Sequence, residues 1–306
     1  MGIDIAYGKW AQSASEYLWL LHNIKLIPNS EARTVLVTRD EFINNSEQIL
    51  LKYDTAIVED WFGMDDYVNL TSIDDPRVVF CTTNMQPLGL KHARVIHYNF
   101  MFNRTKLFYK QQFPITKAGI RYNLLLCSNT GDNYKPVTYN QDRQYDFMFL
   151  NARRYTEERT RAENILRKGR GLITNNTNRL QDDKIMPYNP VPAHYWEACY
   201  FNICIESNVH DANIVHTTEK IWEPIIKYQI PVVLATKHYQ SYMESLGFVF
   251  PVPVFTQPDE YYNFLTEFFT TDVKNFFLKH EDCVKHNHNL FFNLPIDRNV
   301  EQIWKN

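Results

Sequence analysis

Carboxylate, hydroxyl and ammonium side chains gather between residues 206 and 220, where an apolar run ends and an amphipathic run begins. The candidate binding residues of this stretch are Glu206, Asn208, Thr218, Glu219 and Lys220. A carboxylate can bind ribose hydroxyls, while a lysine and the free amides at a helix N-terminus can bind a diphosphate. The residue types therefore suit a nucleotide-sugar, with Glu206 and Asn208 lining the pocket, Glu219 on the ribose and Lys220 on the diphosphate.

A purely structural interpretation of the same residues stays open. Glu219 would then be an acid at the start of a helix, and Lys220 would be a solvated lysine. A cation in the first turn opposes the helix dipole, so Lys220 weakens its helix slightly unless it serves a ligand. Spacing alone does not decide between the two interpretations.

The elements around these residues alternate between strand and helix. Residues 201–205 and 231–235 are short apolar runs typical of buried strands, and residues 238–246 form a second helical run. The run between the strands begins at Thr217 or Thr218 as N-cap and carries apolar residues at helical spacing, namely Ile221, Trp222, Ile225 and Ile226. This order predicts an α/β unit with parallel strands, which binds ligands outside the carboxyl ends of its strands.

A second group of polar residues follows the predicted strand 145–150 and precedes the predicted helix 156–168. It consists of Asn151, Arg153 and Arg154. An Asn and two Arg at the start of a helix would clamp a diphosphate, because arginine offers a bidentate fork to phosphate oxygens. The alternative is that both arginines pair with Asp146, Glu157 or Glu158 on the surface.

The motifs of the second half resemble a known family. Glu206-Ser207-Asn208, a loop, Thr218-Glu219-Lys220-Ile221-Trp222 and then Pro231-Val232-Val233-Leu234 resemble the donor-binding half of α1,3-fucosyltransferase-like glycosyltransferases. The T-E-K helix with Pro224-Ile225, followed by Tyr242-Met243-Glu244-Ser245-Leu246-Gly247-Phe248, is also similar to uncharacterised proteins, many of them from phages. The resemblance covers roughly residues 146–250, and the first half shows no comparable match.

The resemblance implies both a fold and an activity. In that family the T-E-K motif contacts the ribose and phosphates of the nucleotide, the fold is two Rossmann-like domains (GT-B type), and transfer is inverting. We therefore expect an α/β protein with two Rossmann-like domains and a helical C-terminal tail. The expected parts are an acceptor-side domain (1–115), a linker (116–144), a nucleotide-sugar-binding domain (145–255) and C-terminal helices (256–306).

The first half predicts strands at residues 34–37, 55–58, 78–81 and 95–98, again alternating with helical runs. Glu59 and Asp60 directly follow one of these strands. A carboxylate there could deprotonate an acceptor hydroxyl as the catalytic base. Both acids could equally be ordinary turn residues that face water.

Composition limits the remaining classes. The chain has 306 residues, of which 44% are hydrophobic, and a formal net charge of -3, so no overall basic field indicates nucleic acid. The five cysteines are scattered without a C-x-x-C motif, which favours a reduced, cytoplasmic protein, and no apolar run is long enough to span a membrane. No His or Cys spacing predicts a metal site. We expect metal-independent transfer with no cofactor besides the nucleotide-sugar co-substrate.

The acceptor is left open by the sequence. A glycan is the ordinary choice, and a modified base in DNA is the other, because the similar uncharacterised proteins include phage proteins. The DNA option is supported by basic residues among Tyr and Phe in the first half: Lys91, His92, Arg94, Arg104, Lys106, Lys110, Lys117 and Arg121. A solvated basic face would look the same. The alternative from another class is a GT-B-like scaffold without transfer activity that serves as a binding or structural module. The oligomeric state is not predicted.

Overall fold

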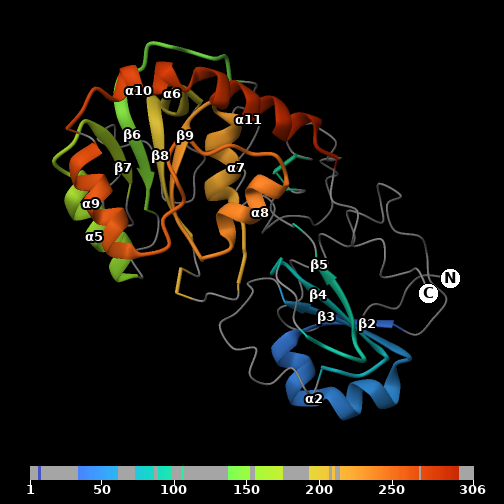
Figure 1. Cartoon of the computed structure of the whole chain (residues 1–306). Helices are drawn as coiled ribbons and strands as arrows, with labels where there is room; N and C mark the ends of the chain where they lie inside the picture. The colour runs from blue at the N-terminus through green and yellow to red at the C-terminus, as the bar shows by residue number, and fades with distance from the viewer. Residues whose placement is uncertain are drawn as a thin grey trace. The chain divides into compact units, whose positions relative to one another are not determined.

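The protein is a mixed α/β protein with two parallel sheets (Figure 1). The computed structural model describes residues 6–7, 34–60, 73–85, 89–97, 99, 102, 105–106, 137–151, 156–174, 193–206, 209–210, 214–268 and 270–295. The chain divides into two compact units. The first comprises Met1–Phe100, Ile214–His216 and Ile296–Asn306, and the second comprises Met101–Asn213 and Thr217–Pro295. The predicted linker lies largely outside the described residues, so the predicted domain boundaries stay predictions.

The first sheet consists of β1 (Ala6–Tyr7), β2 (Thr34–Thr38), β3 (Thr55–Asp60), β4 (Val78–Thr82) and β5 (Arg94–His97), in that order and all parallel. Helix α2 (Arg39–Lys52) begins after Thr38, whose side chain accepts a hydrogen bond from the backbone of Glu41. The four predicted strands are confirmed to within two residues. One strand is longer than predicted: β3 continues through Glu59 and Asp60.

The second sheet consists of β6 (Tyr145–Leu150), β7 (Gly171–Thr174), β8 (Cys199–Ile205) and β9 (Ile230–Leu234). All its strand pairs are parallel, and their order is β7-β6-β8-β9. The chain thus adds β7 on one side of β6 and β8 on the other. The strand order reverses between β6 and β8, and such a point opens a crevice at the carboxyl ends of the two strands.

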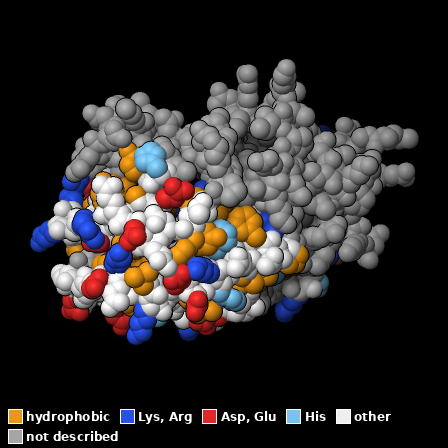
Figure 2. All heavy atoms as spheres, turned by 90° about the horizontal axis from the view of Figure 1, so that it is seen from above, with side chains coloured by type: hydrophobic (Ala, Val, Ile, Leu, Met, Phe, Trp, Pro, Cys, Tyr) orange, Lys and Arg blue, Asp and Glu red, His pale blue; other side chains and the backbone are white. Residues whose placement is uncertain are grey.

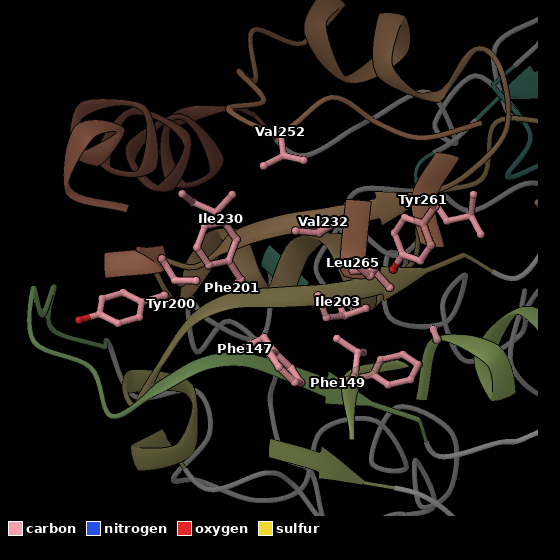
Figure 3. Packing of buried hydrophobic residues seen from close by; sticks show 14 of the residues in the cluster. Phe147, Phe149, Tyr200, Phe201, Ile203, Ile230, Val232, Val252, Tyr261 and Leu265 are labelled. Carbon is pink, nitrogen blue, oxygen red and sulfur yellow. The ribbon is translucent and has the colours of Figure 1, made fainter. Parts of the chain in front are cut away.

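Alternation along the strands gives this sheet two buried faces. Phe201, Ile203 and Ile205 of β8 join a core with α5 (Glu157–Leu166), α9 (Pro258–Phe268) and α10 (Val273–Lys279). Figure 3 shows residues of β6, β8, β9 and α9 within this cluster. Cys204 faces the other way, and its thiol donates to the carbonyl of Lys220 in α7 (Glu219–Ile226). The helices on both faces explain why β8 is buried along its whole length.

The helices before β8 and after β9 have local causes for their boundaries. Helix α6 (Ala193–Glu197) is short, because Cys199 already pairs with Tyr145 as the first residue of β8. The described part of the predicted C-terminal helical tail forms α9, α10 and α11 (Glu281–Asn293). The hydroxyls of Thr270 and Thr271 donate to the last carbonyls of α9, and Asp272 then caps α10.

The C-terminal end of helix α11 is capped by a buried lysine, Lys106, from elsewhere in the chain. The Lys106 ammonium donates to the carbonyl oxygens of Phe291 at 2.7 Å, Phe292 at 3.1 Å and Leu294. It also lies over the rings of Phe102 and Phe291. A cation at the C-terminal end of a helix satisfies its last carbonyls and complements its dipole. Lys106 is fully buried and therefore does not belong to an exposed basic face, as the DNA alternative had assumed.

The surface of the second unit carries both signs of charge. Figure 2 shows acidic and basic side chains interspersed on the described part of one face. In this unit Lys274 pairs with Asp142, and Lys285 of α11 pairs with Glu281 one turn earlier. Among the described residues, no helix is both long and apolar enough to cross a membrane.

We expect Lys106→Met to lower the free energy of unfolding by about 2–4 kcal/mol, because it leaves buried carbonyl oxygens without their donor. Chemical denaturation of both proteins measures the difference. Lys279→Met is the control, because Lys279 is an exposed lysine at the end of another helix and its loss should change stability by less than about 0.5 kcal/mol. Equal stabilities of the two variants would show that the Lys106 contacts contribute nothing.

Candidate active site

Two buried polar residues flank the point where the second sheet reverses its strand order. Asn151 follows β6, Glu206 follows β8, and both are nearly inaccessible to solvent. The backbone of Glu206 still donates to the carbonyl of Leu234 in β9, so the sheet fixes its position. The sequence predicted both residues for the donor site, and the topology brings their strands next to each other.

The carboxylate of Glu206 accepts three hydrogen bonds. Oε1 accepts from the backbone N–H of Thr218 at 3.2 Å and from the hydroxyl of Tyr239 at 2.9 Å, and Oε2 accepts from the hydroxyl of Thr218 at 2.6 Å. Tyr239 is the first residue of α8 (Tyr239–Ser245). A buried carboxylate needs such partners to stay charged away from water. Glu206 therefore ties the end of β8 to the starts of α7 and α8.

The hydroxyl of Thr218 is fully used by its neighbours. It donates to Glu206, accepts from the backbone N–H of Lys220 at 3.3 Å and accepts from the Lys220 ammonium at 3.1 Å. A hydroxyl offers one donor and two acceptor positions, so these three contacts occupy it. Thr218 is thus the N-cap of α7, as predicted, and also the residue that holds the Lys220 side chain.

The Lys220 ammonium lies 3.9 Å from Oε2 of Glu206, and 24% of its side chain is exposed. Helix α7 packs into the core through its apolar face. The residues of this face are all buried, as their spacing predicted, namely Ile221, Trp222, Ile225 and Ile226. Pro224 inside α7 has no N–H for the carbonyl of Lys220. The thiol of Cys204 supplies a donor to that carbonyl instead.

Asn151 is held from the side of α5. Its Nδ2 donates to Oε2 of Glu163 at 3.0 Å, and Oε1 of Glu163 pairs with Arg167 one turn later. Oδ1 of Asn151 is buried and has no hydrogen-bond partner among the described residues. In this orientation Asn151 offers an acceptor, which suits a hydroxyl or N–H group of a ligand better than a phosphate oxygen.

The remaining predicted donor-site residues are only partly described. Arg153, Arg154 and Asn208 lie outside the described residues. Glu219 is the first residue of α7, and its side chain lies outside them as well. The structure therefore brings together Glu206, Thr218 and Lys220 directly, with Asn151 on the neighbouring strand.

Residues near the carboxyl end of β3 form a separate polar network in the first unit. Asp60 is buried, accepts from the hydroxyl of Thr82 at 3.1 Å and lies 3.7 Å from Arg39. The hydroxyl of Thr82 accepts from the backbone of Asn84, whose carbonyl lies 2.6 Å from Nδ1 of His97. That contact requires a proton on Nδ1, since a carbonyl can only accept. The backbone of Glu59 belongs to β3, and its side chain lies outside the described residues.

The sequence analysis missed two residues that form hydrogen bonds to the predicted site residues. Tyr239 and Glu163 are both buried, and each bonds to a predicted site residue. An acid at position 163, one turn before Leu166 on the buried side of a helix, was a usable signal, because a buried acid needs a partner. Tyr239 gave no such signal, since a buried tyrosine in a helix is ordinary core. Within the described residues, no group of three or more His, Cys, Asp or Glu could hold a metal ion.

Comparisons with known proteins give matches among solved structures alone. No protein-family model and no curated protein matches the chain. A crystal structure of an α1,3-fucosyltransferase with GDP-fucose matches with a TM-score of 0.46 and 11% identity, over 86% of this chain and 86% of that one. A structure of an α1,3-fucosyltransferase with GDP gives 0.49 and 14%, over 92% and 81%. A third α1,3-fucosyltransferase structure gives 0.40 and 12%, over 90% and 97%.

The three structures belong to the family that the T-E-K motif resembles. Every TM-score is nevertheless below 0.5, and every identity is far below 25%.

Glu158 in the first turn of α5 gives a pH-dependent contact near this edge of the sheet. Burial opposes its charged form, but hydrogen bonds from its own backbone N–H, from His210 at 2.7 Å and from Thr156 outweigh that effect and lower the pKa of Glu158. A carboxyl whose pKa is lowered on folding contributes stability above its unfolded pKa of about 4.3, and this contribution is lost as the pH falls through the lower folded value.

We expect Glu158→Gln to cost up to about 1 kcal/mol of stability at pH 7 and to cost nothing at pH 2–3, because the pair is partly exposed to solvent. Urea denaturation across this pH range measures the difference. Glu157→Gln is the matched control, an exposed acid in the same turn. A cost that is independent of pH would contradict an electrostatic origin.

Proposed function

We propose that the protein is a glycosyltransferase that transfers a sugar from a nucleotide-diphosphate donor to a hydroxyl acceptor. The observation that carries the proposal is the strand reversal between β6 and β8, which Asn151 and Glu206 directly follow. At this point Thr218, the N-cap of α7, holds Lys220 beside Glu206. Parallel α/β sheets bind ligands at such a point. The sequence motifs of the resembled family fall on the same edge, which supports the donor class.

The donor site assigns a role to each predicted residue. Lys220, Arg153 and Arg154 hold the diphosphate, and Glu219 holds the ribose hydroxyls. Asn151 lies on the neighbouring strand end and offers its acceptor oxygen to a hydroxyl or N–H of the donor. Glu206, Asn208 and Thr218 shape the pocket. Cations and helix amides would then neutralise the leaving diphosphate without a metal ion.

The acceptor side belongs to the first unit in this proposal, and the fold as a whole is of the GT-B type with two Rossmann-like domains. Two separate parallel sheets support this, although the described strands of the first sheet run in sequential order without a reversal. Transfer is proposed to be inverting, with a single base. We propose a glycan as acceptor. Salt-sensitive retardation of duplex DNA in a gel shift would assign the acceptor to nucleic acid instead.

The donor site is tested by binding of nucleotides, namely the diphosphates GDP, UDP and ADP, the monophosphate CMP, and their sugar conjugates. A thermal-shift screen should give a clear positive with one of the diphosphates, because a ligand of the native state raises the melting temperature. We expect Lys220→Gln to weaken binding of that diphosphate by about 10- to 100-fold, the effect of losing one charge-assisted hydrogen bond.

Lys237→Gln is the control for this experiment, because Lys237 is an exposed lysine in the turn before α8. Titration calorimetry gives both dissociation constants. Unchanged binding in a Lys220→Ala, Arg153→Ala double variant would refute the donor site. No binding of any diphosphate by the native protein would favour the non-catalytic binding module.

The catalytic base can be tested once the nucleotide-sugar donor is known. The assay is the slow hydrolysis of this donor, in which water replaces the acceptor. We expect Glu59→Gln to lower kcat by about 10²- to 10⁴-fold if Glu59 is the base. Asp60→Asn should also lower the melting temperature, because it removes the buried carboxylate that Thr82 and Arg39 contact. Full activity in both variants would exclude these acids as the base.

A further inference from the structure

We propose that Tyr239 and Glu206 are positioning residues that set the Lys220 ammonium for a diphosphate through the hydroxyl of Thr218. The proposal rests on the donor site proposed above and adds a residue to it that no sequence motif indicated. Its four members come from three elements, the end of β8, the start of α7 and the start of α8.

The order of the contacts gives the direction of the effect. Tyr239 donates to Oε1 of Glu206, whose Oε2 accepts from the hydroxyl of Thr218. With its proton committed to Glu206, that hydroxyl presents its lone pairs to Lys220 and accepts from both the backbone N–H and the ammonium. The carboxylate therefore orients the hydroxyl, and the hydroxyl provides an acceptor that helps to position the ammonium.

Tyr239 is the hydrogen-bond donor at the start of this series of contacts, and its protonated form is favoured. Burial first, and the Glu206 carboxylate second, raise the pKa of Tyr239 well above its ordinary value, which favours the protonated phenol that donates to Glu206. A lysine held in one place loses less side-chain entropy when a phosphate binds. Pre-organisation of Lys220 is thus what the Tyr239 hydrogen bond contributes.

The chain offers a matched pair of tyrosines to test this. Tyr239 and Tyr261 are both fully buried, but the hydroxyl of Tyr261 has no hydrogen-bond partner among the described residues. Tyr239→Phe removes one hydrogen bond to Glu206, whereas Tyr261→Phe removes a hydroxyl that bonds to none of them. A general loss of core packing would affect both variants alike.

The first readout needs no ligand. The rate at which an acylating reagent modifies Lys220, followed by mass spectrometry, reports how firmly its amine is held. We expect the rate to rise about threefold to tenfold in Tyr239→Phe and to stay at the native value in Tyr261→Phe, with Lys237 as internal standard. Thr218→Val should reproduce the rise and Thr218→Ser should not, which keeps the test valid if Tyr239→Phe does not fold.

The second readout is the dissociation constant of the diphosphate that the native protein binds. We expect it to rise by about threefold to tenfold in Tyr239→Phe, measured well below the melting temperature, and to stay unchanged in Tyr261→Phe. A native labelling rate of Lys220 in folded Tyr239→Phe overturns the proposal, and so does faster labelling with unchanged affinity. Absence of diphosphate binding by the native protein would instead refute the proposed function, while the labelling rates would still decide whether Tyr239 positions Lys220.

Discussion

The arrangement of the second unit depends on one buried carboxylate. Glu206 is 4% exposed, and the Lys220 ammonium lies 3.9 Å from its Oε2, so hydrogen bonds from Thr218 and Tyr239 replace the water that a carboxylate would otherwise bind. Leaving a buried charge without such donors costs several kcal/mol. The starts of α7 and α8 are therefore constrained to the end of β8, and the hydroxyl of Thr218 extends that constraint to Lys220.

A second carboxylate repeats this arrangement on the other side of the strand reversal. Glu163 is buried between Arg167 and Asn151, and it fixes the amide of Asn151 at the end of β6. Each acid thus holds a polar side chain beside the strand reversal: Glu206 holds Thr218, and Glu163 holds Asn151.

Much of this unit could be predicted from the sequence pattern alone. The features that could not be predicted have one physical reason in common. Apolar runs located β6, β8 and β9, and the helical spacing of Ile221 and Ile225 located the buried face of α7, because burial leaves a local periodic signal. The strand order, the burial of Lys106 and the Tyr239 contact are set by residues far apart in the chain. The break between α9 and α10 has a local cause, because the side chain of Asp272 caps the start of α10.

Charge balance finally limits how the proposed donor site can work. Lys220 is partly compensated by Glu206 at 3.9 Å, so the pair presents little net positive charge to a diphosphate. A bound diphosphate carries more negative charge than one compensated lysine can offset, and helix amides add only about half a charge at the start of α7. Further cations are required, and Arg153 and Arg154 follow the strand on the other side of the reversal in the sequence. The proposed donor site therefore assigns geometry to Lys220 and most of the positive charge to the two arginines.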